Sequence, residues 1–291
     1  MLSGHQPRIS AEVCVRVPSE VWELLAKFGV AVVQISEITA RPSHALKNTY
    51  RVTLADGRVV KVRRLQSVAR AEQVERLLKA LGPNPAWAGL LLRFREFFLE
   101  EWVEGESLGG QPPEPAVARQ CGVILAQLHQ VAIPADEAIG LSVEQELGQV
   151  RSHLGELEAA GRFTRTEAIE LADRAVALAP RRIQPGIVHL DFCGENLVWH
   201  PIRGPVCVDN ETLRIGSCEQ DLGRAVHRWN LEGVARAEFL AGYAAAEGPA
   251  GLDALPFWGL AAEAYSASIR LRYRFADAGA PIQALKRRLE P

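Results

Sequence analysis

The sequence predicts an α+β fold with two unequal lobes, and three observations indicate this. The first hundred residues contain short segments rich in β-branched residues, with a hairpin turn signal at Asp56-Gly57. The remainder of the chain has apolar residues at helical spacing. The chain has 291 residues, whereas one domain typically has roughly 100 to 200. We therefore expect an N-terminal lobe over 1–103 and a C-terminal lobe over 104–291.

The smaller, N-terminal lobe is expected to hold a five-stranded antiparallel sheet and one main helix. Ser19 can cap a short first helix, which Gly29 ends. The main helix is expected over 68–81, where apolar residues recur at a spacing of three to four. The five strands are expected over 30–38, 48–54, 58–62, 90–94 and 96–102.

The larger, C-terminal lobe is expected to be mainly helical. Apolar residues at helical spacing predict helices over 115–129, 143–160, 165–178, 220–246 and 255–276. Short β-like segments interrupt these helices over 186–190, 196–200 and 205–208. Because loops on a rigid scaffold often carry functional side chains, we expect the site at these interruptions.

The composition argues against several classes of protein. A net charge of -2 gives no basic excess that would attract nucleic acid. The sequence has no apolar run of the kind that a secretory signal or a membrane span needs, so we expect a cytoplasmic protein without membrane contact. Five cysteines without a C-x-x-C pair favour reduced thiols over disulfides or a zinc site. We expect a monomer or a homodimer.

One loop carries the pattern of a phosphoryl-transfer site. Asp191 precedes Asn196 by five residues, in a loop entered from an apolar strand. Phosphoryl transfer needs a carboxylate that accepts the proton of the attacking hydroxyl, and oxygen ligands that hold magnesium against the phosphates. Asp209 follows a second apolar strand, which would aim another carboxylate at the same metal. The pattern therefore predicts phosphoryl transfer.

The same residues carry a resemblance to a known family. His189, Asp191 and Asn196 form the pattern H-x-D-x-x-x-x-N, and an apolar strand and Asp209 follow it. This pattern resembles the aminoglycoside phosphotransferase and choline kinase family. Further segments in that family's order lie at 48–52, 125–129, 221–222 and 239–243. The resemblance covers most of the chain and implies a two-lobed protein-kinase-like fold.

The resemblance implies roles for residues around the catalytic loop. Asp191 is the implied catalytic base, and Asn196 and Asp209 are the implied ligands of Mg²⁺. His189 and Asp221 are expected to support the loop through hydrogen bonds. ATP or GTP is the implied phosphate donor.

In the smaller lobe, the resemblance implies a nucleotide site. Lys61 lies toward the end of the third strand and is expected to reach the α and β phosphates. Glu72 is the candidate for the ion pair that orients Lys61, and Glu75 is its rival. Glu101 and Val103 lie in the connector whose backbone groups are expected to bind adenine.

The sequence departs from the family's pattern in three places. The connection over 41–47 contains no glycine, and Ser43 is our candidate there for nucleotide binding. Leu190 stands where the family usually has a glycine, and Asn210 stands where a tryptophan often follows the metal aspartate. Protein kinases have an arginine at the position of Leu190, so a small-molecule acceptor is favoured over a regulated protein kinase.

The acceptor is expected to be a small hydroxylated compound. Acidic residues that would suit a cationic acceptor lie at Glu144, Glu146, Glu156, Glu158, Glu167, Glu170 and Asp173. Glu211 and Glu263 are further candidates for acceptor contacts. Basic residues near the C-terminus argue against a strongly cationic acceptor, at Arg270, Arg272, Arg274, Lys286, Arg287 and Arg288.

Three functions stay open at this point. The first is transfer of the γ-phosphate of ATP or GTP to a hydroxyl of an aminoglycoside-like antibiotic, which would confer resistance. The second is that of a metabolic kinase for choline, a sugar or an amino alcohol. The third is nucleotide binding without catalysis. Retention of the lysine, the catalytic base and both metal ligands argues against the third function, because a pseudokinase has no reason to keep all four.

Overall fold

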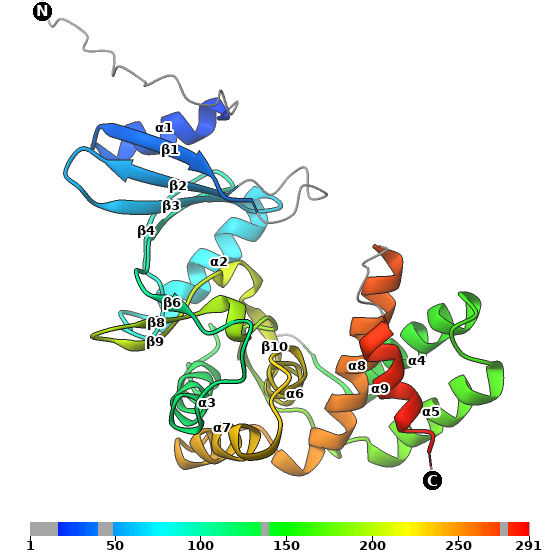
Figure 1. Ribbon diagram of the computed structural model, residues 1–291. Coiled ribbons are helices and arrows are strands. Elements are labelled where there is room, and N and C mark those ends of the chain that lie inside the picture. The colour runs from blue at the N-terminus through cyan, green and yellow to red at the C-terminus, as the bar shows by residue number, and fades with distance from the viewer. Residues whose placement is uncertain (1–16, 40–48, 135–139, 274–278, 291) are drawn as a thin grey trace, which may run out of the picture. The chain divides into compact units, whose positions relative to one another are not determined.

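The computed structural model describes residues 17–39, 49–134, 140–273 and 279–290 (Figure 1). The chain divides into two compact units. The first unit comprises 1–106 and 198–212, and the second comprises 107–197 and 213–291. Among the described helices, none is both long and apolar enough to span a bilayer.

The first unit is built on a five-stranded antiparallel sheet of order β1-β2-β3-β5-β4 (Figure 1). Its strands are β1 (Val32–Glu37), β2 (Thr49–Leu54), β3 (Val59–Arg64), β4 (Leu90–Phe94) and β5 (Phe97–Glu101). The predicted turn at Asp56-Gly57 joins β2 to β3, and Gly57 has a φ of 85°, which glycine adopts without strain. Two helices accompany the sheet, α1 (Ser19–Phe28) and α2 (Val68–Leu81).

Alternation along the strands separates two apolar clusters in this unit. Phe97 and Leu99 of β5 pack in a cluster with Leu24 of α1, whereas Phe98 packs with Val74 of α2. Successive side chains of a strand point to opposite faces, so α1 and α2 cover opposite faces of the sheet. Each fully buried side chain of this kind stabilises the fold by roughly 1.5–3 kcal/mol.

A segment from much later in the sequence completes the first unit. It contains most of β8 (Leu197–His200), β9 (Gly204–Cys207) and the short turn η3 (Asn210–Thr212). A second sheet has the order β6-β8-β9, with β6 at Glu106–Ser107. The Cys207 backbone donates to Ala86 O (2.8 Å) and accepts from Ala88 N (2.9 Å). These bonds fix the strand that leads into Asp209.

The second unit is mainly helical, as predicted. Its helices are α3 (Pro115–His129), α4 (Val143–Ala159), α5 (Arg165–Leu178), α6 (Cys218–Arg228), α7 (Gly233–Ala245), α8 (Leu255–Arg272) and α9 (Gly279–Arg287). Strands β7 (Pro185–Val188) and β10 (Arg214–Ser217) form an antiparallel pair. Short 3₁₀ turns lie at η2 (Gly194–Asn196) and η4 (Leu252–Ala254).

The single helix predicted over 220–246 is wrong, because the structure has two helices there, α6 and α7. Asn230 has a φ of 52° and Gly233 a φ of 49°, and these left-handed residues end one helix before the next begins. The apolar spacing continues across the break, so the sequence pattern does not reveal it. The break leaves Arg228 in the last turn of α6.

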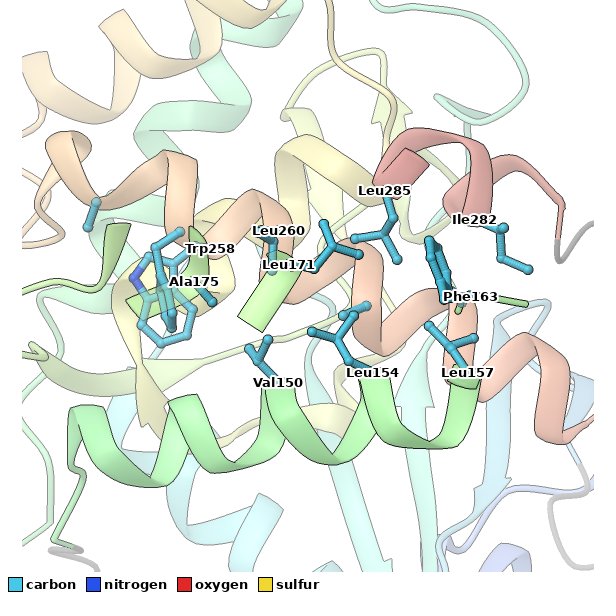
Figure 2. Packing of buried hydrophobic residues seen from close by; sticks show 14 residues of the cluster. Val150, Leu154, Leu157, Phe163, Leu171, Ala175, Trp258, Leu260, Ile282 and Leu285 are labelled. Atoms are coloured by element: carbon cyan, nitrogen blue, oxygen red, sulfur yellow. The ribbon is translucent and has the colours of Figure 1, made fainter. Parts of the chain in front are cut away.

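The largest described core of the second unit lies among α4, α5, α8 and α9. Figure 2 shows Val150, Leu154 and Leu157 on one face of α4, pointing toward Leu171 of α5 and Leu260 of α8. Capping boxes begin both α4 and α5, formed by Ser142 with Gln145 and by Thr164 with Glu167. Local caps and an apolar face therefore specify the same two helices.

Helices α3 and α7 approach each other at two glycines. A Cβ atom on Gly122 would lie 2.0 Å from the carbonyl oxygen of Phe239, and one on Gly242 would lie 2.0 Å from that of Arg119. Neither backbone can yield without separating the helices. We expect Gly122→Ala to lower the free energy of unfolding by about 1–3 kcal/mol in a urea titration.

A matched control for this prediction is Gly155→Ala on the exposed side of α4, where nothing lies within 4 Å of the added methyl group. Alanine in an open helix position should raise stability by about 0.5–1 kcal/mol. Equal effects of the two substitutions would contradict the close approach of α3 and α7.

Candidate active site

The predicted catalytic loop lies in the second unit, and hydrogen bonds between its own residues stabilise it. Asn196 Nδ2 donates to the backbone oxygen of Asp191 (2.8 Å) and to Asp191 Oδ2 (2.9 Å). The η2 turn makes this possible, because Asn196 N bonds back to Cys193 O at 2.9 Å. Asn196 is buried, whereas the Asp191 side chain is 32% exposed. The structure thus presents one carboxylate of the loop to a ligand.

Arg228 also contacts Asp191, and the sequence pattern did not indicate this residue. Its Nε lies 3.1 Å from Asp191 Oδ1, and Nη2 lies 3.1 Å from the same oxygen. Burial alone would lower the pKa of Arg228, but Asp191 raises it, so the guanidinium stays charged. The signal was its position seven residues after Asp221, which puts both on one face of α6.

Asp221 ties the start of the catalytic loop to α6 and is fully buried. It accepts hydrogen bonds from His189 N (2.6 Å) and Leu190 N (2.7 Å). His129 Nε2 lies 3.1 Å from Asp221 Oδ2, and its other ring nitrogen lies 2.7 Å from the Tyr243 hydroxyl. Although burial alone would raise the pKa of Asp221, the His129 hydrogen bond and charge hold it below its ordinary value.

The loop backbone is left-handed at Leu190, where φ is 61°. An L residue with a side chain adopts this conformation at a cost of roughly 1–2 kcal/mol, which a glycine avoids. The hydrogen bond from Leu190 N to Asp221 helps to hold the conformation. Next along the loop, Asp191 N donates to His189 Nδ1 at 3.3 Å.

Asp221→Ala should destabilise the protein strongly, because it leaves two buried backbone N–H groups without an acceptor. We expect a loss of about 3–5 kcal/mol in the free energy of unfolding. Because the folded pKa of Asp221 is lowered, its stabilisation is present above the ordinary aspartate range and is lost as the pH falls through the folded pKa. Urea titrations from neutral to acid pH should therefore converge for wild type and variant.

The control for this prediction is Asp253→Ala in η4, where the carboxylate is exposed. Its effect should stay within about 0.5 kcal/mol, as is usual for surface substitutions. A similarly small effect of Asp221→Ala would contradict the role of Asp221 in holding the loop.

In the first unit, a buried charge network surrounds the predicted phosphate-binding lysine. Lys61 Nζ lies 2.5 Å from Asp209 Oδ1 and 3.4 Å from Glu100 Oε2. Arg63, two residues along β3 on the same face, also contacts Asp209 and lies 3.0 Å from Glu211 Oε2. Lys61, Arg63 and Glu100 are all buried.

Asp209 stands at the end of β9 with a left-handed backbone, at a φ of 64°. Burial alone would raise its pKa, but the charges of Lys61 and Arg63 hold the pKa well below its usual range. Both cations contact Oδ1, and Oδ2 accepts no hydrogen bond within the described ranges. The Asp209 side chain is 37% exposed. The structure thus provides a charged carboxylate with one oxygen left for a ligand.

The structure corrects the predicted partner of Lys61, which pairs neither with Glu72 nor with its rival Glu75 in the described structure. Both glutamates on α2 instead pair with Arg93 of β4. The acid opposite Lys61 is Glu100, because the register of β3 with β5 makes the two direct cross-strand neighbours.

The other residues predicted to bind nucleotide are Ser43, Glu101 and Val103. Ser43 lies outside the described residues. The Glu101 carboxylate pairs with Arg203, and its backbone N–H donates to Gly89 O at 2.8 Å. Val103 packs in an apolar cluster with Ala88. Adenine binding at Glu101 and Val103 stays a prediction.

The acidic residues predicted for the acceptor are largely engaged within the protein. Glu211 pairs with Arg63, and Glu263 pairs with Arg288 through both oxygens, at 2.6 and 2.9 Å. On α4 and α5, further acids bond to Gln220, Arg272, Thr164 and Arg174, and these acids are Glu146, Glu156, Glu167 and Glu170. Contact of Glu211 or Glu263 with the acceptor stays a prediction.

The donor chemistry of the predicted magnesium ligands fits the metal. Mg²⁺ prefers hard oxygen ligands from a few side chains, with water and phosphate filling its other positions. Asp209 offers a free carboxylate oxygen, and Asn196 uses its amide nitrogen for Asp191, which leaves the amide oxygen. No cluster of three or more His, Cys, Asp or Glu side chains suited to a metal occurs in the described parts of the chain.

The match to a family model now defines the class of protein. The model of the phosphotransferase enzyme family matches residues 37–258, and the chain belongs to this family. It is therefore a phosphotransferase that acts on a hydroxyl group. Kinases of this family use ATP as the phosphate donor. No curated protein matches the chain.

Solved structures share the fold at low sequence identity. The macrolide 2'-phosphotransferase of Brachybacterium faecium is 17% identical, with a TM-score of 0.67, and the match covers 91% of this chain and 97% of that chain. The choline kinase of Streptococcus pneumoniae is 14% identical, with a TM-score of 0.66, and the coverages are 92% and 96%. A spectinomycin phosphotransferase in complex with ADP and spectinomycin is 13% identical, with a TM-score of 0.65 and coverages of 95% and 96%.

Proposed function

We propose that the protein transfers the γ-phosphoryl group of ATP, or of GTP, to a hydroxyl of a small molecule, with Asp191 as the catalytic base. The observation that carries this proposal is the arrangement of Asp191, whose carboxylate is fixed by Asn196 and Arg228 while about a third of the side chain stays exposed. A general base needs this combination of fixed position and access to the substrate.

The residues of the catalytic loop and their partners have different roles in the proposed reaction. Asp191 accepts the proton of the acceptor hydroxyl as its oxygen attacks the γ-phosphorus. Arg228 and Asn196 keep the carboxylate in one orientation, and Asp221 and His189 keep the loop in place. Positioning and charge stabilisation supply most of the catalysis in phosphoryl transfer, because the protein does little covalent chemistry itself.

Lys61 is the proposed contact of the α and β phosphates in the first unit. Its ammonium group is buried and balanced by Glu100 and Asp209, so its position is fixed before nucleotide binds. Asn196 and Asp209 are the proposed ligands of Mg²⁺, which would neutralise charge on the phosphates when bound. Arg63 supports Asp209 through their ion pair.

An aminoglycoside-like antibiotic is the first candidate acceptor, in keeping with the macrolide and spectinomycin phosphotransferases among the structural relatives. A metabolic substrate is the second candidate. One observation favours the second, namely that many of the acids expected to receive a cationic antibiotic are paired with basic or hydrogen-bonding groups. Paired carboxylates attract a cationic ligand less than free ones do.

The test is phosphate transfer from ATP and from GTP, with magnesium, to a panel of aminoglycosides, macrolides, choline, sugars, amino alcohols and hydroxy acids. Asp191→Ala is the control. If the wild type phosphorylates one class of acceptor and Asp191→Ala does not, the result would support the proposal and identify the acceptor class. Nucleotide binding with magnesium but no transfer to any compound would favour a non-catalytic nucleotide-binding protein.

A further inference from the structure

A small cavity in the second unit lies beside α6 and contains two arginines. Its volume is about 40 Å³, and α4, β10, α6 and α8 line it. The polar and charged residues of its lining are Glu146, Gln149, His153, Arg214, Gln220, Arg224 and Tyr265. On this measure a single water molecule needs about 10–15 Å³, so the cavity has room for a small polar group of a ligand.

Neither arginine has a carboxylate partner within the described part of the chain. Arg224 lies over the Tyr265 ring, 4.4 Å from its centroid, and its buried Nε has no hydrogen-bond acceptor. Arg214 is exposed at the start of β10. Both arginines line the same cavity. Partial burial first, and then the charge of Arg224, lower the pKa of Arg214, whereas Tyr265, Asp221 and Glu146 act in the opposite direction. The lining thus has two guanidinium groups and one carboxyl group, and this excess of positive charge favours an anion between the arginines.

The acidic residue of the cavity does not balance these cations. Glu146 is buried and accepts a hydrogen bond from Gln220 at 3.2 Å, and it forms no ion pair with either arginine in the described structure. Burial raises its pKa, which favours its neutral form, although Arg214 opposes this shift. The cavity therefore keeps a net positive charge.

Helix α6 contributes both to the cavity and to the contact with the proposed catalytic base. Arg224 precedes Arg228 by four residues, so the two lie on one face of the helix about one turn, or roughly 5.4 Å, apart. Arg228 contacts Asp191 directly. A larger cavity of about 390 Å³ is lined by Gly223, Val226, His227 and Asn230, which lie on an adjoining side of α6.

We infer that Arg214 and Arg224 bind a carboxylate group of the acceptor, so that the acceptor is a small hydroxylated acid. This inference rests on the proposed function and adds the class of substrate. The fork of a guanidinium group matches a carboxylate, and Arg224 Nε supplies a donor that is otherwise unsatisfied. With the acceptor's hydroxyl at Asp191, its carboxylate would reach the cavity about one helical turn away.

The kinetic test compares acids with their uncharged amides. The acceptors are glycerate, 3-hydroxybutyrate, homoserine and gluconate, each paired with its primary amide, and the readout is initial phosphorylation rate with Mg-ATP. We expect the wild type to prefer at least one acid over its amide by about 10 to 100-fold in kcat/KM, the range of a charged hydrogen bond. In Arg224→Gln and in Arg214→Gln, the KM for that acid should rise until most of this preference is lost.

The matched control is Arg236→Gln, which removes an arginine from the lining of the larger cavity. It should keep the preference for the acid. A wild type that treats acid and amide alike, or that phosphorylates only uncharged or cationic acceptors, would overturn the inference. So would an unchanged preference in both Arg214→Gln and Arg224→Gln.

A second measurement separates the anion site from the kinase proposal. Crystals of the wild type and of Arg224→Gln are soaked in bromide, and its anomalous signal locates bound anions. We expect a peak between Arg214 and Arg224 that is absent from the variant. Such a peak without phosphate transfer to any acceptor would support the anion site and count against the proposed function. Absence of the peak in the wild type would overturn the site whatever the kinetic result.

Discussion

Asp191→Ala is expected to lower kcat by about 10² to 10⁴-fold, the usual effect of losing a general base. The variant has no carboxylate to accept the proton of the attacking hydroxyl. Affinity for Mg-ATP should persist, because Lys61 and Asp209 belong to the first unit and do not contact this side chain. Asn196, the second proposed metal ligand, keeps its hydrogen bond to the backbone oxygen of residue 191. The measurements are steady-state turnover and calorimetric titration with nucleotide.

Asp191→Asn separates proton acceptance from the structural role of the side chain. Asparagine keeps the shape of the side chain and an oxygen that can accept from Arg228, but it cannot take up the proton. Its kcat should fall as far as that of the alanine variant, while its stability stays closer to the wild type. Normal turnover in Asp191→Asn would exclude Asp191 as the base.

The hydrogen bonds within the predicted catalytic loop are local, so a short sequence pattern can indicate them. Asn196 lies only five positions after Asp191, and one 3₁₀ turn is enough to bring the amide to the carboxylate. The family resemblance is confirmed by the match of the family model. The antiparallel sheet and the mainly helical second unit were also predictable, because turn signals and apolar spacing are properties of short segments.

Contacts between distant segments were not predictable in the same way. The pairing of Lys61 with Glu100 depends on the register of β3 with β5, which no local pattern specifies. Arg93 binds the two glutamates that were candidates for this pair. The contact of Arg228 with Asp191 likewise depends on the rotation of α6 and on the break that follows it.

The number of acidic residues in the sequence does not indicate the charge of the acceptor, because many of these residues have partners within the protein. Glu167 completes the capping box of α5 with Thr164, and Glu170 pairs with Arg174 one turn later. Their charges are therefore satisfied within their own helix. No sequence pattern links Arg214 to Arg224, because they lie ten positions apart in different elements. The fold brings both to one cavity.

Asp209→Ala should abolish the dependence of nucleotide affinity on magnesium. The substitution removes the free carboxylate oxygen proposed as a metal ligand, and it also removes one negative charge beside Lys61 and Arg63. These two cations should then attract metal-free ATP at least as well as before. Affinity for ATP with and without Mg²⁺, measured by calorimetry, should become nearly equal.

Glu96→Ala is the matched control, because it removes a carboxylate that pairs with Arg64 in the same unit at 3.0 Å and has no proposed role in binding. It should keep the magnesium dependence of the wild type. Loss of that dependence in Asp209→Ala alone would support the assignment of Asp209 as a metal ligand. If Asp209→Ala binds Mg-ATP normally, the carboxylate serves only to balance Lys61 and Arg63, and the metal must be held by other groups.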